Sequence, residues 1–279
     1  MRKYAICNET FEGWEHARIC ARIAELGYTG LEVAPFTLAP RITEVTAVQR
    51  AELRRQAQAA GVQILGLHWL LARTEGFHLT SPDPAVRQRT GEYLAELAHA
   101  AADLGGNILV LGSPAQRTYP AEWSRQKAED FALDTLSYCL KALEQRQVYL
   151  CLEPLSPTET NFLNTATEAV ALAQRLNHPY VRLHLDVKAM SSEALPIPEI
   201  IRTHAAWLTH FHANDPNKRG PGFGSTDFCP ILQALWDIHY TGWISVEVFD
   251  YSPDPETIAR ESIRYLKECA EKVTPFSKR

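Results

Sequence analysis

Four residues in the second half of the sequence carry side chains suited to binding one metal ion. Glu153, Asp186, His212 and Glu247 each end a short apolar run, and they are 33, 26 and 35 residues apart. One strand-plus-helix unit takes about 31 residues when roughly 250 residues form eight such units. Three carboxylates brought together repel one another unless a cation neutralises them. The spacing therefore predicts a single divalent ion held by these four side chains.

The donor set also indicates which ion to expect. Three carboxylates and one imidazole suit Mn²⁺, Mg²⁺, Co²⁺ or Fe²⁺ better than a metal that prefers thiolates. The six cysteines are scattered, and none joins the set, which argues against a structural zinc site. We expect Mn²⁺, with Mg²⁺, Co²⁺, Fe²⁺ or Zn²⁺ as alternatives.

Other polar residues fall near the same strand ends. Side chains two positions apart on a strand share a face, so His184 and His210 should lie one layer below Asp186 and His212, as hydrogen-bonded supports. His68, at the end of an earlier apolar run, is expected to reach the substrate. Glu32 is a weaker candidate of the same kind.

These residues lie on a regular alternation of apolar runs and amphipathic stretches. Expected helices include 14–26, 48–60, one opening at 81–86 and ending near 104, and one capped by Asp254 with Pro255 in its first turn. The runs expected to form strands are 3–7, 30–34, 62–68, 107–113, 148–154, 181–186, 208–214 and 243–249.

Eight units in succession predict a (β/α)₈ TIM barrel over residues 1–279 as a single α/β domain. The rival is a doubly wound open sheet, but no GxGxxG motif follows the first strand. In such a barrel the chemistry lies at the C-terminal ends of the strands.

Composition restricts the partners of the chain. The net charge is −5, and no run of Lys or Arg stands out, so nucleic acid is not an expected partner. The N-terminal residues lack the apolar core of a signal peptide, and no stretch of about 18 apolar residues occurs. We expect a cytoplasmic protein that does not bind membranes, and a homo-oligomer is compatible with the sequence.

Several motifs resemble those of the xylose isomerase-like superfamily of sugar isomerases and epimerases, which includes tagatose 3-epimerases, hydroxypyruvate isomerase, inosose dehydratase and endonuclease IV. They are LEPLSPTETNFLNTATEA (152–169), LHLDVKAM (183–190), FHANDPNKRGPGFGSTDF (211–228) and ISVEVFDYSPDPETIARES (244–262). The resemblance assigns the four metal ligands to the single-metal epimerase branch. It also makes Glu159 a substrate contact and places Arg219 one position from a substrate-binding arginine.

The sequence departs from these relatives at one place. Ala189 stands where the epimerases carry a substrate-contacting histidine, and Lys188 is the nearby polar group. Endonuclease IV fits worse, because Ser113 and Ala189 replace two of its additional histidines. The cationic side chains Lys188 and Arg219 slightly favour an anionic substrate.

The predicted function is that of an isomerase or epimerase acting on a sugar or sugar phosphate. The metal would polarise the carbonyl and stabilise an enediolate, with Glu153 and Glu247 as acid and base. Two alternatives remain at this point: a metal-dependent dehydratase of a cyclic polyol ketone such as an inosose, and a non-catalytic barrel that binds a sugar.

Overall fold

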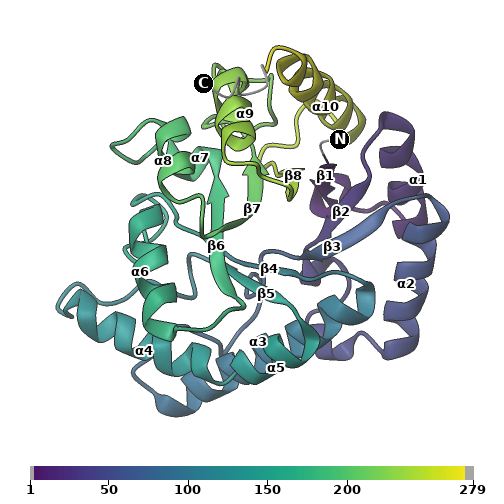
Figure 1. The fold of residues 1–279 in the computed structure, drawn as a ribbon. Helices are drawn as coiled ribbons and strands as arrows, with labels where there is room; N and C mark the ends of the chain where they lie inside the picture. The colour runs from purple at the N-terminus through teal and green to yellow at the C-terminus, as the bar shows by residue number, and fades with distance from the viewer. Residues whose placement is uncertain (1–2, 274–279) are drawn as a thin grey trace.

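The computed structural model describes residues 3–273 and forms a closed barrel of eight parallel strands, paired in chain order from β1 round to β8. Figure 1 shows the helices arranged as a ring around these strands. This confirms the predicted barrel. The strands are β1 Lys3–Cys7, β2 Gly30–Val33, β3 Gln63–Leu67, β4 Ile108–Leu111, β5 Tyr149–Leu152, β6 Val181–Asp186, β7 Leu208–Ala213 and β8 Trp243–Val246.

The four helices expected from the sequence are present. Helix α1 (His16–Leu26) begins two residues later than expected and ends at Gly27, whose φ of 93° is a left-handed conformation that glycine adopts without strain. Helix α2 (Ala47–Ala59) starts with a capping box. Helix α3 (Pro84–Leu104) is capped by Asp83, and in α10 (Pro255–Glu271) Asp254 accepts from the Thr257 N–H, as predicted.

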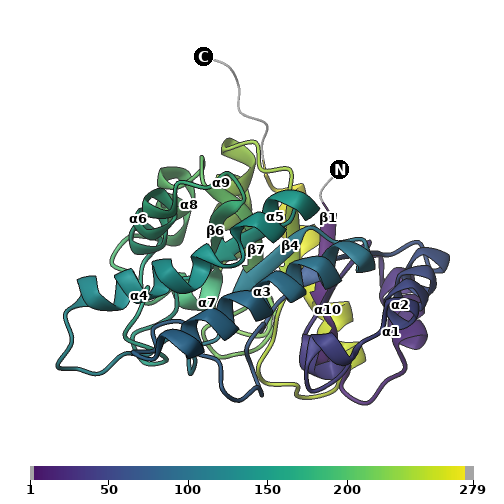
Figure 2. The ribbon, with the colours of Figure 1, turned by 90° about the horizontal axis from the view of Figure 1, so that it is seen from below.

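The other α-helices are α4 Arg125–Ser137, α5 Leu140–Arg146, α6 Ala166–Leu176, α7 Val187–Met190, α8 Ile197–Thr203 and α9 Phe228–Asp237, and the short 3₁₀ helices are η1 Asn8–Phe11, η2 Pro35–Thr37 and η3 Ile42–Glu44. Long segments that follow the strands gather along the lower edge of Figure 2. Of the helices within residues 3–273, none has both the length and the apolar character needed to cross a bilayer.

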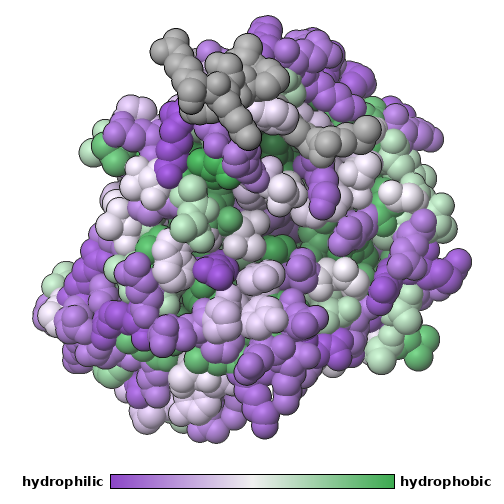
Figure 3. Space-filling view, viewed as in Figure 1, coloured by the Kyte–Doolittle hydropathy of each residue, from purple (hydrophilic) through white to green (hydrophobic). Residues whose placement is uncertain are grey.

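The strands present two different faces. Outward side chains such as Leu109, Leu183 and Phe211 are buried in one large apolar cluster with the helices. Inward side chains from β6 and β7 are polar, because His184 pairs in register with His210, and Asp186 with His212. Figure 3 shows a mostly hydrophilic rim with hydrophobic side chains visible between the helices. The outer face of the strands therefore packs against the helices, while the inner face of β6 and β7 carries polar side chains.

Candidate metal centre

The four residues predicted to bind metal come together at the C-terminal end of the barrel. Asp186 ends β6 and His212 lies in β7, while Glu153 and Glu247 each come one residue after the end of a strand. One ligand atom from each lies within 4.8 Å of the others, and all four side chains are buried. This is the convergence that the spacing along the sequence predicts.

Asp186 is held by two hydrogen bonds to its carboxylate. The Ala189 N–H donates to Oδ1 at 2.7 Å, because Asp186 caps the short helix α7. The Asn214 amide donates to Oδ2 at 2.5 Å, and its own oxygen accepts from the Lys188 N–H at 2.8 Å. The buried amide of Asn214 thus ties the end of β7 to the carboxylate on β6. The sequence reasoning missed Asn214, although the motif HAND places it two residues after His212.

Glu247 is fixed by ring nitrogens on both oxygens. The indole N–H of Trp69 donates to Oε1 at 2.7 Å, and His212 Nδ1 lies 3.1 Å from Oε2. The indole stacks on Phe249 and is tilted against Phe36, with ring centroids 5.8 Å away in each case. Trp69 therefore positions one of the two carboxylates assigned as acid and base. No simple sequence signal marks this role.

The side chain of Glu153 is held by the shape of its surroundings rather than by hydrogen-bond donors. A Cβ added to Gly112 would lie 1.6 Å from its Oε2, so only glycine leaves room for this carboxylate. Beneath it, the buried guanidinium of Arg117 donates from Nη1 to the Glu153 carbonyl oxygen at 2.8 Å. Gly112 and Arg117 were also not singled out from the sequence, because neither carries a ligand or a proton in the expected chemistry.

Crowding of negative charge shifts the proton affinities of the site. Burial, followed by the charge of Glu247, raises the pKa of Asp186 to about 6. Burial and the neighbouring Glu247 and Asp186 raise the pKa of Glu153 well above its usual range. Burial acts in the same direction on Glu247, but the charge and hydrogen bond of His212 outweigh it, so its pKa is lowered. Three carboxylates at such short range fit a divalent cation, which would supply the missing positive charge.

A cavity of about 340 Å³ opens beside this group. Glu153 and Glu247 form part of its wall, and Glu159 lines it as well. The rings of Trp69 and Phe249 provide apolar faces. The cavity therefore combines carboxylates with aromatic surface, next to the expected position of the ion.

Lys188 and Arg219 are engaged with carboxylates of the protein itself. Lys188 Nζ lies 2.9 and 2.8 Å from the two carboxylate oxygens of Glu159. Arg219 lies 3.7 Å from Asp250 and donates to the Ser252 carbonyl at 2.7 Å. Neither belongs to the cavity wall in the part of the chain that the structure describes. The contacts of Lys188 and Arg219 therefore do not support the expectation that they bind an anionic substrate.

His68 lies beside the metal centre, with a ring nitrogen within 4.8 Å of ligand atoms of Cys7, Glu9 and Glu247. Its side chain is fully buried, with Nε2 2.8 Å from Glu9 Oε2, and the described cavity wall includes its neighbour Trp69 instead. β3 ends at Leu67, and Trp69, which lines the cavity, adopts a left-handed φ of 52°. Glu32 is also fully buried and contacts His210 and His212 at 2.9 and 3.0 Å.

Comparison with known proteins places this architecture among sugar-converting enzymes. Residues 20–269 match the model of the xylose isomerase-like TIM barrel family. The chain is 30% identical over 246 residues to a D-psicose 3-epimerase of Agrobacterium fabrum, covering 85% of this chain and 82% of that protein. It is also 30% identical over 190 residues to an L-ribulose 3-epimerase of Mesorhizobium japonicum, covering 66% and 62%.

Solved structures show the same fold at lower sequence identity. A D-psicose 3-epimerase crystallised in the presence of D-fructose superposes with a TM-score of 0.83 at 23% identity, covering 96% of this chain and 99% of that one. An L-ribulose 3-epimerase gives a TM-score of 0.85 at 21% identity, covering 98% and 95%. The chain therefore belongs to the xylose isomerase-like TIM barrel family, in which its relatives are sugar epimerases and isomerases.

Proposed function

We propose that the protein is a divalent-metal-dependent epimerase of uncharged ketoses, which inverts the carbon next to the carbonyl. The observation that carries the proposal is the convergence of Glu153 and Glu247 on the same ion position from strand ends β5 and β8, at the wall of one cavity. Two carboxylates on different sides of a substrate can remove a proton from one face and return it to the other. The relatives named D-psicose and L-ribulose 3-epimerase support this reaction class.

Each residue of the site has its own role in the proposed reaction. A bound divalent ion would polarise the substrate carbonyl and make the neighbouring C–H more acidic. Glu247, oriented by Trp69, and Glu153, seated against Gly112, act as the base and acid, and they exchange roles when the opposite epimer binds. Glu159 faces the cavity as an acceptor for substrate hydroxyl groups, with Lys188 holding its carboxylate in place.

An uncharged substrate is favoured by the charges around the cavity. Among the described wall residues, Glu153, Glu159 and Glu247 are acidic, and Arg73, which lies 3.6 Å from Glu12, is basic. A phosphate group brings about −1.5 to −2 charges and needs a free cation, whereas Lys188 already pairs with Glu159. We therefore revise the preference for an anionic substrate that Lys188 and Arg219 suggested.

The test is turnover in D₂O followed by NMR, with Mn²⁺ added and with D-psicose, D-fructose, L-ribulose and their phosphates as substrates. We expect epimerisation of a free ketose with one deuterium incorporated at the inverted carbon. A carbonyl moved to the adjacent carbon would indicate an isomerase instead, and loss of water would indicate the dehydratase. Binding of a free sugar without any exchange would support the non-catalytic barrel.

A further inference from the structure

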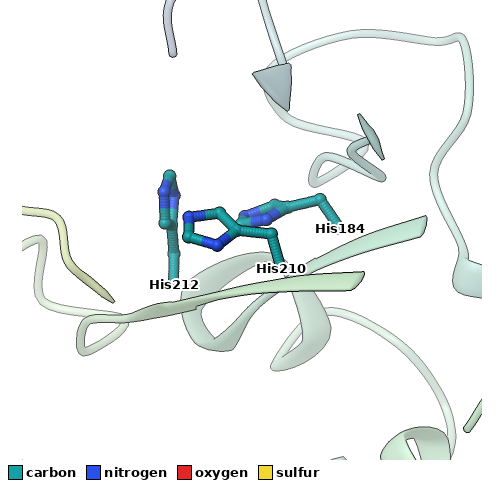
Figure 4. Close-up of side chains that lie close together, drawn as sticks. All are labelled: His184, His210 and His212. Carbon is teal, nitrogen blue, oxygen red and sulfur yellow. The ribbon is translucent and has the colours of Figure 1, made fainter. Parts of the chain in front are cut away.

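A second group of potential ligands lies inside the barrel, below the proposed ion at the mouth. His184 on β6 and His210 and His212 on β7 are fully buried, with ring centroids 4.1 to 5.3 Å apart. One nitrogen from each ring lies within 4.8 Å of the others. Figure 4 shows the three rings side by side, with nitrogens turned toward the space between them.

Several nitrogens of this group form no hydrogen bond among the described residues, although His184 Nε2 lies 3.8 Å from Glu153 Oε1. Neither Nδ1 nor Nε2 of His184, and not Nδ1 of His210, forms a hydrogen bond with any residue that the structure describes. Buried polar atoms are normally paired, and an unpaired one calls for an explanation. An imidazole lone pair is also the nitrogen ligand that Zn²⁺, Cu²⁺, Fe²⁺ and Ni²⁺ prefer in proteins.

A carboxylate borders the three rings. Glu32 on β2 is fully buried, and its Oε2 lies 2.9 Å from His210 Nε2 and 3.0 Å from His212 Nε2. The interior therefore offers three nitrogens with a carboxylate as their neighbour, whereas the mouth offers three carboxylates and one imidazole. Since donor type selects the metal, the two positions favour different ions.

We propose that the barrel interior binds a second divalent ion of the nitrogen-preferring class, such as Zn²⁺, through His184, His210 and His212, with the Glu32 carboxylate as the hydrogen-bond partner of His210 Nε2. His212 is shared between the two sites: Nδ1 faces Glu247 at the mouth, and Nε2 faces Glu32 in the interior. With both ions bound its ring is an imidazolate, and its N–H proton is released to solvent. The interior ion links β6 and β7 and fixes the ring plane of His212, which in turn orients the mouth site. The proposal concerns metal binding alone and does not depend on the epimerase reaction.

The experiment counts metal ions in the full-length protein. Chelator-treated protein is reloaded with Zn²⁺, freed of excess metal and measured by plasma mass spectrometry. We expect two ions per chain in the wild type, one in His184→Leu, and one in the mouth variant Glu153→Gln/Asp186→Asn. The matched control is His204→Leu, which removes a buried histidine whose nitrogens contact Thr167 and the Ile200 carbonyl. This control should retain two ions.

A wild-type chain that never exceeds one ion, or a His184→Leu variant that binds as much as the wild type, would overturn the proposal. A second measurement does not depend on the folding of His184→Leu. Co²⁺ added to Glu153→Gln/Asp186→Asn should give the intense visible bands of a four-coordinate, nitrogen-rich site. Only weak bands, typical of six-coordinate oxygen ligation, would contradict it. Because no substrate is present, a negative result leaves the epimerase proposal intact.

Discussion

Glu153 and Glu247 occupy equivalent places in the barrel, one residue beyond a strand end, yet the two sides of the site hold them differently. Glu247 receives the indole N–H of Trp69 and faces His212, and its pKa is lowered. Glu153 is confined by Gly112, and burial with its anionic neighbours raises its pKa. One carboxylate is oriented by donors and the other by the absence of a side chain opposite. Similar positions in the sequence repeat therefore do not imply similar chemistry.

The largest effect should come from neutralising either carboxylate. Glu153→Gln and Glu247→Gln should each lower kcat/KM on the order of 10³-fold, because each removes a proton carrier and an anionic ligand. If the two groups serve opposite faces, each variant should retain slow deuterium exchange with only one of the two epimers. NMR in D₂O measures this, with Glu92→Gln on the exposed face of α3 as control. Normal turnover of either variant would refute its role.

The substitution Gly112→Ala tests only the confinement of the Glu153 carboxylate. The added methyl group would overlap the Glu153 carboxylate, so we expect a loss of activity of at least about 100-fold, since small displacements of catalytic groups have effects of that size. The same substitution at Gly61, where nothing lies within 4 Å, should lower the melting temperature slightly through its positive φ but leave kcat unchanged. Steady-state kinetics and thermal melts distinguish the two outcomes. Unaltered activity in Gly112→Ala would show that Glu153 is not confined as described.

The substitution Trp69→Phe tests the hydrogen bond that orients Glu247. Phenylalanine keeps a ring between Phe36 and Phe249 but removes the N–H, so kcat should fall by about 10-fold or more, as loss of a hydrogen bond to a charged group predicts, with little change in KM. Because the indole N–H helps to lower the pKa of Glu247, the acidic limb of the pH profile should move to higher pH. A change in KM alone, with an unmoved pH profile, would indicate that Trp69 only shapes the cavity.

The pH dependence of the unfolding free energy tests whether the buried carboxylates raise the pKa of Asp186. The folded-state pKa of Asp186, about 6, lies above its ordinary value of 3.8, so the metal-free folded state binds this proton more tightly than the unfolded state. Stability from this group is present at low pH and is lost as the pH rises from about 4 to about 6. Relative to Asp186→Asn, the wild type in chelator should lose up to about 3 kcal/mol of unfolding free energy over this range. Denaturant titrations measure the difference, and Mn²⁺ should abolish it.

The smallest effect is expected at Lys188, which the structure pairs with Glu159. Lys188→Met frees the Glu159 carboxylate but removes no group that faces the substrate, so KM for a free ketose should rise by about 2- to 5-fold, as for loss of a partly exposed ion pair. Kinetics with free and phosphorylated ketoses provide the comparison. A selective loss of turnover of the phosphorylated sugar would restore the phosphate-binding role first assigned to this lysine.

Much of the outline could be predicted from local patterns. The eight strands fall within the expected ranges, since apolar runs bounded by glycine and polar residues are a local property. Asp254 and Pro255 mark the start of α10 because capping depends on neighbouring residues only. His68 shows the limit of predictions from local patterns. Its position after a strand predicts a substrate contact, but its side chain is fully buried against Glu9, and the neighbouring Trp69 lines the cavity.

The sequence alone determined the barrel and the four converging donors, because strand periodicity and the repeat length bring one position per unit to the same end. The tertiary structure decided which partners surround those donors: the indole against Glu247, the amide of Asn214 against Asp186, and the pairing of Lys188 with Glu159. These contacts join residues from different βα units. No local pattern encodes them, since they depend on how the loops pack against one another after the barrel closes.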